Sequence, residues 1–350
     1  MGNTKFRSIT RTSLAAVAAA WVALSPMSSA AGENPGSPAP KQACAGVNML
    51  PELATNTPEA YSKILSAAKA TPNTEAVLWR IEREGVPRSY LLGTVHMTDP
   101  RITGFSPKLE SALAETKTLA LEIADLSDNA TNAAIAKAAE LVIFTDGRKL
   151  DKLLSRDEYT KVKASLKSAG LPSEMAAMFR PWVISMIMSV SACERQKVTN
   201  GVPVLDLKLA NFARENNKKL VGLETIESQF NAMAAIPDEQ QIAMLRANLK
   251  FADRIDDTME TLLQLYLTRD MGSAWPFQLA LAKQAGINQD SFSGFQKRIV
   301  SDRNRQMRDT ALPLLRDGST LIAVGALHLI GNDGLVALLR EAGYTMTPVE

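Results

Sequence analysis

Two histidines carry the strongest chemical signal in this 350-residue chain, because they are its only histidines and share one local context. His96 ends the segment SYLLGTVH, and His328 ends the segment LIAVGALH. In both segments an apolar run leads to a glycine, Gly93 or Gly325, and the histidine follows three residues later. Histidine titrates near neutral pH and is the commonest metal ligand in proteins. The repeated G-x-x-H therefore predicts a site for acid–base chemistry or for a metal ion.

Three carboxylates occupy the same kind of position as the histidines. Glu122, Asp206 and Glu224 each lie at or just beyond the end of a short apolar run that reads as a strand. In open α/β sheets, ligands bind outside the carboxyl ends of the strands. If these strands run parallel in one sheet, the three carboxylates and both histidines converge on one edge. The glycine before each histidine allows a tight turn or a close approach to a ligand.

A predicted long helix over Phe292–Leu312, ending before Pro313, adds two more polar candidates. Arg303 lies in line with an apolar stripe of this helix, and Asn304 lies on the adjoining row. Polar groups within a buried stripe need partners, and the carboxylates at the sheet edge are suitable ones.

Two histidines and a carboxylate are a donor set for a divalent ion that leaves positions open for water and substrate. Such an ion acidifies water and polarises a carbonyl group, a second carboxylate takes the proton, and Arg303 or Asn304 steadies the developing oxyanion. Each residue also has a structural reading. Glu122 fits a charge at a strand edge, Asp206 fits a helix cap, and Arg303 fits a structural ion pair. The sequence contains no P-loop, G-x-G-x-x-G, G-x-S-x-G or H-E-x-x-H motif.

The elements that must position these residues alternate between strands and helices, which predicts an α/β fold with a mixed central sheet and flanking helices. Two runs, Ala76–Glu82 and Ser89–Val95, read as an antiparallel hairpin, and Leu50–Ala70 reads as one amphipathic helix. Further strands are expected at 118–123, 201–205, 219–223, 319–324 and 344–347. A helical insertion is expected at about 131–198, within a domain that spans residues 44–350.

The N-terminus reads as an export signal over residues 1–30, followed by a disordered leader over 31–43. A basic start, a short apolar stretch and small residues near Ala30 predict cleavage there; an uncleaved anchor is the alternative. Removing residues 1–30 takes away three basic and no acidic residues, so the formal charge falls from +2 to −1. We therefore expect a periplasmic or secreted protein without stable membrane insertion and without a nucleic-acid partner. The sequence leaves the oligomeric state open.

The chain has two cysteines, Cys44 and Cys193. In an oxidising compartment, two cysteines far apart in the sequence read as one disulfide. A thiol metal ligand or a nucleophile is the alternative, but no C-x-x-C or Cys–His pair supports it.

An ordered set of motifs carries a resemblance to a known family. It comprises LLGTVHMTDP at 91–100, LALE at 119–122, GLET at 222–225, DRNRQM at 302–307, VGALHL at 324–329 and GNDG at 331–334. The set resembles the TraB/GumN family, which also contains the animal Tiki proteins, over residues 44–348. The resemblance implies a fold similar to the erythromycin-esterase and ChaN-like proteins. Its Tiki branch implies metal-dependent proteolysis at His96, His328 and Glu122, with Glu224, Arg303 and Asn304 around them.

The leading hypothesis is a secreted hydrolase that depends on a divalent ion (manganese, cobalt or zinc) and cleaves a peptide or protein substrate. His96 and His328 bind the ion, and Glu122 is a ligand or the general base. One rival is a metal-free hydrolase of the erythromycin-esterase kind, in which a histidine–glutamate pair activates water. The other is a protein that binds a metal, haem or a peptide without turnover.

Overall fold

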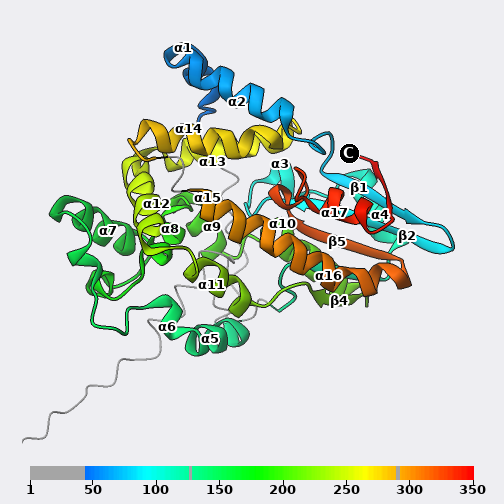
Figure 1. Ribbon diagram of the computed structural model, residues 1–350. Coiled ribbons are helices and arrows are strands. Elements are labelled where there is room, and N and C mark those ends of the chain that lie inside the picture. Colours follow the sequence, from blue (N-terminus) through cyan, green and yellow to red (C-terminus); the bar gives the residue numbers. More distant parts are fainter. Residues whose placement is uncertain (1–43, 126–127, 289–291) are drawn as a thin grey trace, which may run out of the picture.

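The computed structural model describes residues 44–125, 128–288 and 292–350, and it shows an α/β protein built on one six-stranded mixed sheet (Figure 1). The export signal expected at 1–30 and the leader expected at 31–43 lie outside the described residues. The strands are β1 (Leu78–Arg83), β2 (Val86–Thr94), β3 (Thr118–Leu121), β4 (Lys219–Gly222), β5 (Thr320–Gly325) and β6 (Thr345–Pro348). Their order across the sheet is β4-β3-β5-β2-β1-β6.

Four neighbouring strands, β4, β3, β5 and β2, run parallel, whereas β1 pairs antiparallel with both β2 and β6. The expected hairpin is confirmed: β1 and β2 turn at Gly85, whose φ of +72° favours glycine. In the parallel part, Gly93 lies opposite Val324, and Leu121 lies opposite both Ala323 and Gly222. The carboxyl ends of these four strands therefore meet at one edge of the sheet.

Helices cover both faces of the sheet and fix its position. The first two are α1 (Leu50–Asn56) and α2 (Pro58–Ala70), and those beside the sheet are α3 (Pro100–Thr103), α4 (Pro107–Glu115), α10 (Leu205–Glu215), α16 (Asp302–Asp317), the short η9 (Ala326–His328) and α17 (Leu335–Glu341). Leucines of α4 and α10 form one buried layer with Leu92 and Leu119. Met307 and Leu315 of α16 form the other layer with Ile322. Each fully buried leucine stabilises the fold by about 1.5–3 kcal/mol.

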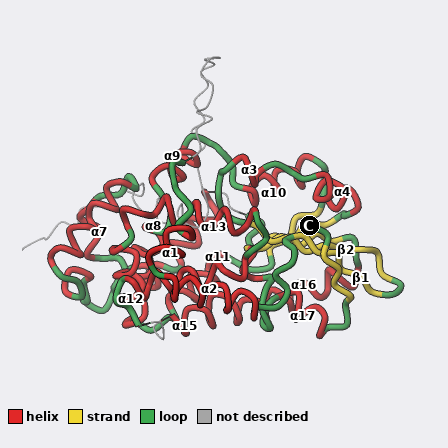
Figure 2. The backbone as a smooth tube through the Cα atoms, turned by 90° about the horizontal axis from the view of Figure 1, so that it is seen from above, coloured by secondary structure: helices red, strands yellow, loops and turns green. Residues whose placement is uncertain are grey.

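A second helical body lies at the carboxyl edge of the parallel strands (Figures 1 and 2). Its first stretch holds α5 (Asp128–Lys137), α6 (Ala139–Val142), η3 (Leu150–Lys152), α7 (Arg156–Ser168), η4 (Ser173–Ala177), α8 (Pro181–Met188) and α9 (Ala192–Thr199). Its second stretch holds α11 (Ile226–Ala234), α12 (Asp238–Lys250), η5 (Ala252–Arg254), α13 (Ile255–Leu267), η6 (Met271–Ser273), α14 (Ala274–Gln284), α15 (Ser293–Gln296) and the π-helix η8 (Lys297–Ser301). Phe179 and Trp182 of the first stretch share a core with Phe230 and Leu245 of the second. The helical body is thus assembled from two separate parts of the chain.

Three expected elements were wrong. The strand expected at 201–205 is absent, because Gly201 turns with a φ of +81° and Pro203 has no N–H to donate to a sheet; α10 begins at Leu205 instead. The single helix expected over Leu50–Ala70 is divided at Thr57, which leaves helical geometry before Pro58.

The third is the helix expected to end before Pro313, which continues to Asp317. Burial of Ala311 and Leu315 against the sheet offsets the one hydrogen bond that the proline removes. The helix ends at Gly318, whose φ is +71°. Its start also differs from a uniform α-helix, because residues 297–301 form one π-helical turn.

A disulfide joins Cys44, the first described residue, to Cys193 of α9. The pairing expected from the two-cysteine count is present. Among the described residues, no helix combines the length and the apolar character that crossing a membrane requires.

Candidate active site at the carboxyl edge of the sheet

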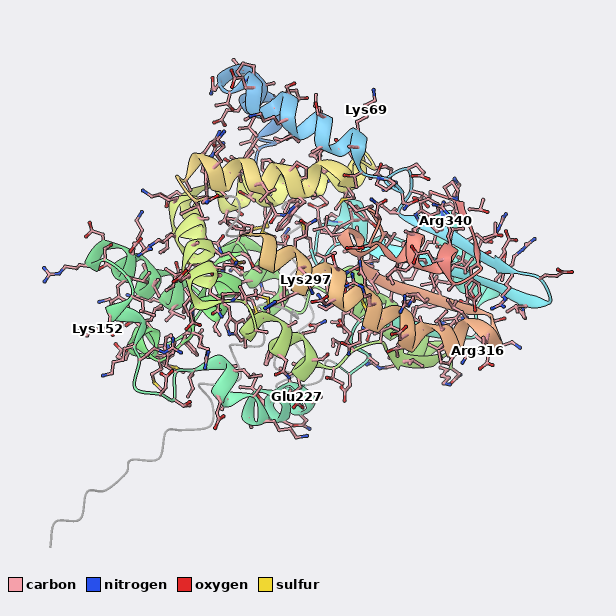
Figure 3. The ribbon with its side chains drawn as sticks, viewed as in Figure 1. Lys69, Lys152, Glu227, Lys297, Arg316 and Arg340 are labelled. Carbon is pink, nitrogen blue, oxygen red and sulfur yellow. A yellow bond between two sulfur atoms is a disulfide. The ribbon has the colours of Figure 1, made fainter. Side chains whose placement is uncertain are left out.

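Exposed charged side chains of both signs project from the outer helices, as the six labelled in Figure 3 illustrate: Lys69, Lys152, Glu227, Lys297, Arg316 and Arg340. The carboxyl edge of the sheet is different, because ionisable side chains are gathered there inside the protein. His96 follows β2, Glu122 follows β3, Glu224 follows β4 and His328 follows β5. The backbone N–H of Glu224 donates to the carbonyl of Glu122 (2.9 Å), which extends the parallel pairing as far as the site.

His328 is held as a neutral ring with a free Nε2. The Nδ2 group of Asn304 donates to the carbonyl of Asp333 (2.7 Å), so the Oδ1 of Asn304 faces the ring. His328 Nδ1 lies 2.6 Å from this Oδ1, which can only accept, and Nδ1 therefore carries the proton. Burial and the nearby Arg303 lower the pKa of His328 to about 3. Its Nε2 lone pair is left to act as a ligand or a base.

His96 is held from the opposite side, by Asp206. The Oδ2 of Asp206 lies 2.8 Å from His96 Nδ1, and its Oδ1 accepts from Thr94 Oγ1 (2.8 Å). Attraction to Asp206 raises the pKa of His96 to about 9, although 43 % of the His96 side chain is exposed and water screens part of this effect. Asp206 reaches the site from the first turn of α10 and not from the end of a strand, which corrects the expected route.

Glu122, Glu224 and Arg303 form a buried ion network. Arg303 donates from Nη2 to Glu122 (2.7 Å) and to Glu224 (2.6 Å), and its Nε also donates to Glu224. Burial alone would raise the pKa of Glu122, but Arg303 and the two histidines hold it well below its usual range. The carboxylates likewise raise the pKa of Arg303 despite its burial. The side-chain amide of Gln229 donates to both glutamates.

The glycines of the two G-x-x-H motifs, Gly325 and Gly93, have different structural roles. A Cβ on Gly325 would lie 3.3 Å from Glu122 Oε1, 3.5 Å from His328 Cδ2 and 4.0 Å from His96 Nε2. Gly325 therefore leaves space between the three side chains, and its N–H donates to Glu122 Oε1 (2.6 Å). A Cβ on Gly93 would instead lie 2.9 Å from the backbone of Ala326, so Gly93 allows β2 to pack closely against η9.

The donors around this space suit a divalent ion in type. Both imidazoles have Nδ1 engaged by an oxygen, an arrangement that orients metal-binding histidines. His328 Nε2 lies 3.9 Å from Glu122 Oε1, a separation that two ligands of one ion can have when each bond is about 2.1 Å. However, no three His, Cys, Asp or Glu side chains within residues 44–125, 128–288 and 292–350 are grouped closely enough to hold an ion as they stand.

The fold brings together every polar residue singled out at the sheet edge, and it places Cys44 and Cys193 elsewhere, in the disulfide. Two participants had no sequence signal that we recognised. Gln229 follows Glu224 within α11, where it resembles any amide on a helix, and Thr94 is an ordinary β-strand residue. Each contacts a residue more than 100 positions away, Gln229 at Glu122 and Thr94 at Asp206.

A separate hollow of about 1240 Å³ lies beside the site but does not contain it. Its walls come from α2, α14 and η8, from Leu327 of η9 and from the following loop, including Asp333. The hollow is not lined by either histidine, by any of the three carboxylates or by the arginine of the site.

Comparison with known proteins places the same region in one family. Residues 77–348 match the model of the TraB/PrgY/gumN family. "Metalloprotease TIKI1" of Danio rerio is 26 % identical over 321 residues, covering 78 % of this chain and 63 % of the relative. "Metalloprotease TIKI2" of Xenopus tropicalis is 25 % identical over 328 residues, covering 79 % of this chain and 60 % of the relative. An uncharacterized protein of Treponema pallidum is 21 % identical over 277 residues, covering 76 % and 81 %.

This chain thus spans less than two thirds of the length of the two Tiki relatives named above. No solved structure matches it, so the expected likeness to the erythromycin-esterase and ChaN-like folds is not supported. The coarser expectation, an α/β protein with a mixed sheet and many helices, is confirmed.

Proposed function

This chain belongs to the TraB/PrgY/gumN family, and from that premise we propose that it is a divalent-metal-dependent hydrolase that cleaves peptide bonds. Relatives named as metalloproteases support the reaction class. The observation that carries the proposal is the arrangement around Gly325: two imidazoles and a carboxylate lie within 4.0 Å of the position that a Cβ would take. His96, His328 and Glu122 are the residues that would hold the ion.

The charges of the site favour a divalent cation. In the metal-free protein, Glu122, Glu224 and Asp206 are countered by Arg303 and by a protonated His96, which leaves one negative charge in excess. Deprotonation of His96, which ligand binding requires, leaves two. A divalent ion neutralises the cluster, and a buried cluster without excess charge avoids a large desolvation cost. His96 is the more exposed of the two histidines, since 43 % of its side chain is exposed against 8 % for His328.

Each residue then has a defined task. A bound divalent ion supplies Lewis acidity, which polarises a carbonyl group and makes water more acidic. His328 offers a lone pair on Nε2 that Asn304 aims. Asp206 aims the ring of His96 and receives its Nδ1–H. Glu122 stays ionised, and its Oε1 lies 3.9 Å from His328 Nε2, where it can serve either as a ligand of the ion or as the proton acceptor.

Arg303 and Asn304 are positioning residues in this proposal. Arg303 is buried and donates to Glu122, to Glu224 and to the carbonyl of Ile299. Asn304 uses its amide on His328 and on Asp333. The hydrogen bonds of both side chains are made within the protein, so the positioning role replaces the oxyanion role suggested by the sequence. Glu224 anchors Arg303 and so fixes the orientation of Glu122.

A metal-free hydrolase remains the second candidate for a specific reason. Among the described residues, no three His, Cys, Asp or Glu side chains are close enough together to coordinate one ion. A neutral His328 and an ionised Glu122, 3.9 Å apart, are also the elements of a pair that activates water directly. Metal dependence separates the two candidates.

The test begins with the metal content of purified protein, before and after treatment with a chelator. A peptide library is then digested by wild type, His96→Ala, His328→Ala and the exposed-site control Glu227→Gln. We expect metal-dependent cleavage that falls at least 100-fold in both histidine variants and is unchanged in the control. Cleavage that survives chelation supports the metal-free pair. Metal or peptide binding without cleavage by wild type supports a binding protein, and cleavage unchanged in both histidine variants refutes this site.

We also propose that the protein acts outside the cytoplasm. The disulfide between Cys44 and Cys193 supports an oxidising compartment, which agrees with the export signal expected from residues 1–30. Fractionation of cells that express the full chain, with a mass measurement of its mature N-terminus, tests both statements.

A further inference from the structure

The segment that carries His96 is held from two sides. On one side, His96 itself contacts Asp206 of α10. Toward the helical body, the same segment is held by Glu194 of α9, whose Oε2 accepts from the backbone N–H of Thr98 (2.9 Å) and from its hydroxyl (2.7 Å). Three residues further along, Arg101 donates to both carboxylate oxygens of Glu260 on α13. The position of His96 therefore depends on α9 and α13 as well as on its own strand.

Burying the Glu194 carboxylate costs folding free energy unless hydrogen bonds or opposite charges compensate for it. Its carboxylate is buried, with 5 % of the residue exposed, and Lys197 Nζ is 3.9 Å away. The cap of α9 is supplied by Ser191, whose hydroxyl accepts from the backbone of Glu194, so the Glu194 side chain is not needed to start the helix. Its strong contacts are the two donors of Thr98, two residues beyond His96.

The disulfide adjoins this carboxylate. Cys193 precedes Glu194 on α9, and Cys44 Sγ lies 3.7 Å from Glu194 Oε1. The short segment after Cys44 is fixed to α13, since the N–H of Val47 donates to Asp257 and the N–H of Met49 donates to Thr261 (both 2.9 Å). The bond thus links α9 to α13, the two helices that hold the His96 segment, and both lie near α3 in Figure 2.

We propose that Glu194 is a positioning residue that sets the orientation of His96 through Thr98, and that the Cys44–Cys193 disulfide keeps Glu194 in place. The consequence for catalysis rests on the proposed function. The geometrical part does not, because it concerns only the position of a histidine ring. Full activity would then require the oxidised protein, as expected for an enzyme that operates after export.

The chain's two histidines make the test direct. In a ¹H–¹⁵N spectrum of the imidazole groups of the tag-free protein, His96 and His328 give two separate sets of signals. We expect Glu194→Ala to shift or broaden the His96 signals, to leave those of His328 unchanged, and to weaken zinc binding about 10-fold. Glu194→Gln retains an oxygen acceptor for Thr98 and is expected to stay within twofold of wild type. Glu158→Ala is the control, because Glu158, like Glu194, accepts from a backbone N–H, but it lies on α7 and its other partner is Arg246.

Two further variants complete the design. Thr98→Val removes one of the two donors while keeping the side-chain shape, and it decides the question if Glu194→Ala does not fold. The double variant Cys44→Ser/Cys193→Ser is expected to shift the His96 signals in the same direction as Glu194→Ala; unshifted signals would overturn the role of the disulfide. His96 signals and zinc affinity that match the Glu158→Ala control in folded Glu194→Ala and Thr98→Val would overturn the role of Glu194. The imidazole spectrum requires neither metal nor turnover, so a wild type that cleaves nothing refutes the proposed function and not this inference.

Discussion

Replacing Gly325 with alanine separates the folding of the protein from the chemistry proposed for its site. Gly325 has a φ of −52° and a ψ of 136°, which alanine adopts without strain. The added methyl would meet Glu122 Oε1 at 3.3 Å and His328 Cδ2 at 3.5 Å. These contacts are tight but involve side chains, so they can be relieved by small shifts.

Two effects on stability nearly cancel in this variant. Loss of the glycine's freedom in the unfolded chain stabilises the folded state by about 0.4–1 kcal/mol. Crowding of Glu122 costs about 1 kcal/mol, the low end for an overpacked site because side chains can shift, so we expect the free energy of unfolding to stay within about 1 kcal/mol of wild type. Ligand binding should respond very differently, because the methyl occupies space among all three donors. We expect zinc affinity to fall at least 100-fold, or about 2.8 kcal/mol, with loss of any metal-dependent cleavage.

The assay combines urea unfolding with zinc titration by competition with a chromophoric chelator. Gly93→Ala is the comparison, since its Cβ would lie 2.9 Å from the Ala326 backbone and 3.0 Å from Ala326 Cβ. Backbone cannot move aside as a side chain can, so this variant should lose about 1–3 kcal/mol of stability. Zinc binding by Gly325→Ala that equals wild type would refute the placement of the ion beside Gly325. Unfolding of Gly325→Ala would refute our account of the space there.

Two other predictions concern the charges of the site. Arg303→Met leaves Glu122 and Glu224 buried without their counter-ion, and it should destabilise the protein by about 3–5 kcal/mol in urea unfolding at neutral pH; a loss below about 1 kcal/mol would contradict the network. In metal-free protein, Asp206 raises the pKa of His96 from 6.5 to about 9, so the stability from this pair is fully present below pH 6.5 and is lost as the pH rises toward 9. Because His96 is 43 % exposed, we expect only about 1–2 kcal/mol from it. Urea unfolding of wild type and Asp206→Asn at pH 6 and pH 9.5 measures this difference, and an equal gap at both pH values would contradict it.

The six strands of the sheet and the residues that follow them could be predicted from the sequence, because both are local properties, although the run at 201–205 was wrongly predicted to be a strand. Apolar runs that end in Gly-x-x-His, or in Leu-Glu, indicate where a strand ends and which polar side chain follows it. Parallel strands bring their carboxyl ends together, so the meeting of His96, Glu122, Glu224 and His328 follows once the sheet is assumed. The two cysteines indicated one disulfide, but the bond between Cys44 and Cys193 is seen only in the folded chain.

The tertiary structure decided how these groups are held and charged. The sequence indicated that Asp206 lies near the histidines, but not that it reaches His96 from the first turn of a helix, 110 residues away in the chain. The proton of His328 is assigned by Asn304, which Asp333 orients in turn. Helix α16 continues past Pro313 because it packs against the sheet. Local sequence determines which groups reach the edge of the sheet, but a proton's position and a pocket's volume depend on partners that only the folded chain brings within bonding distance.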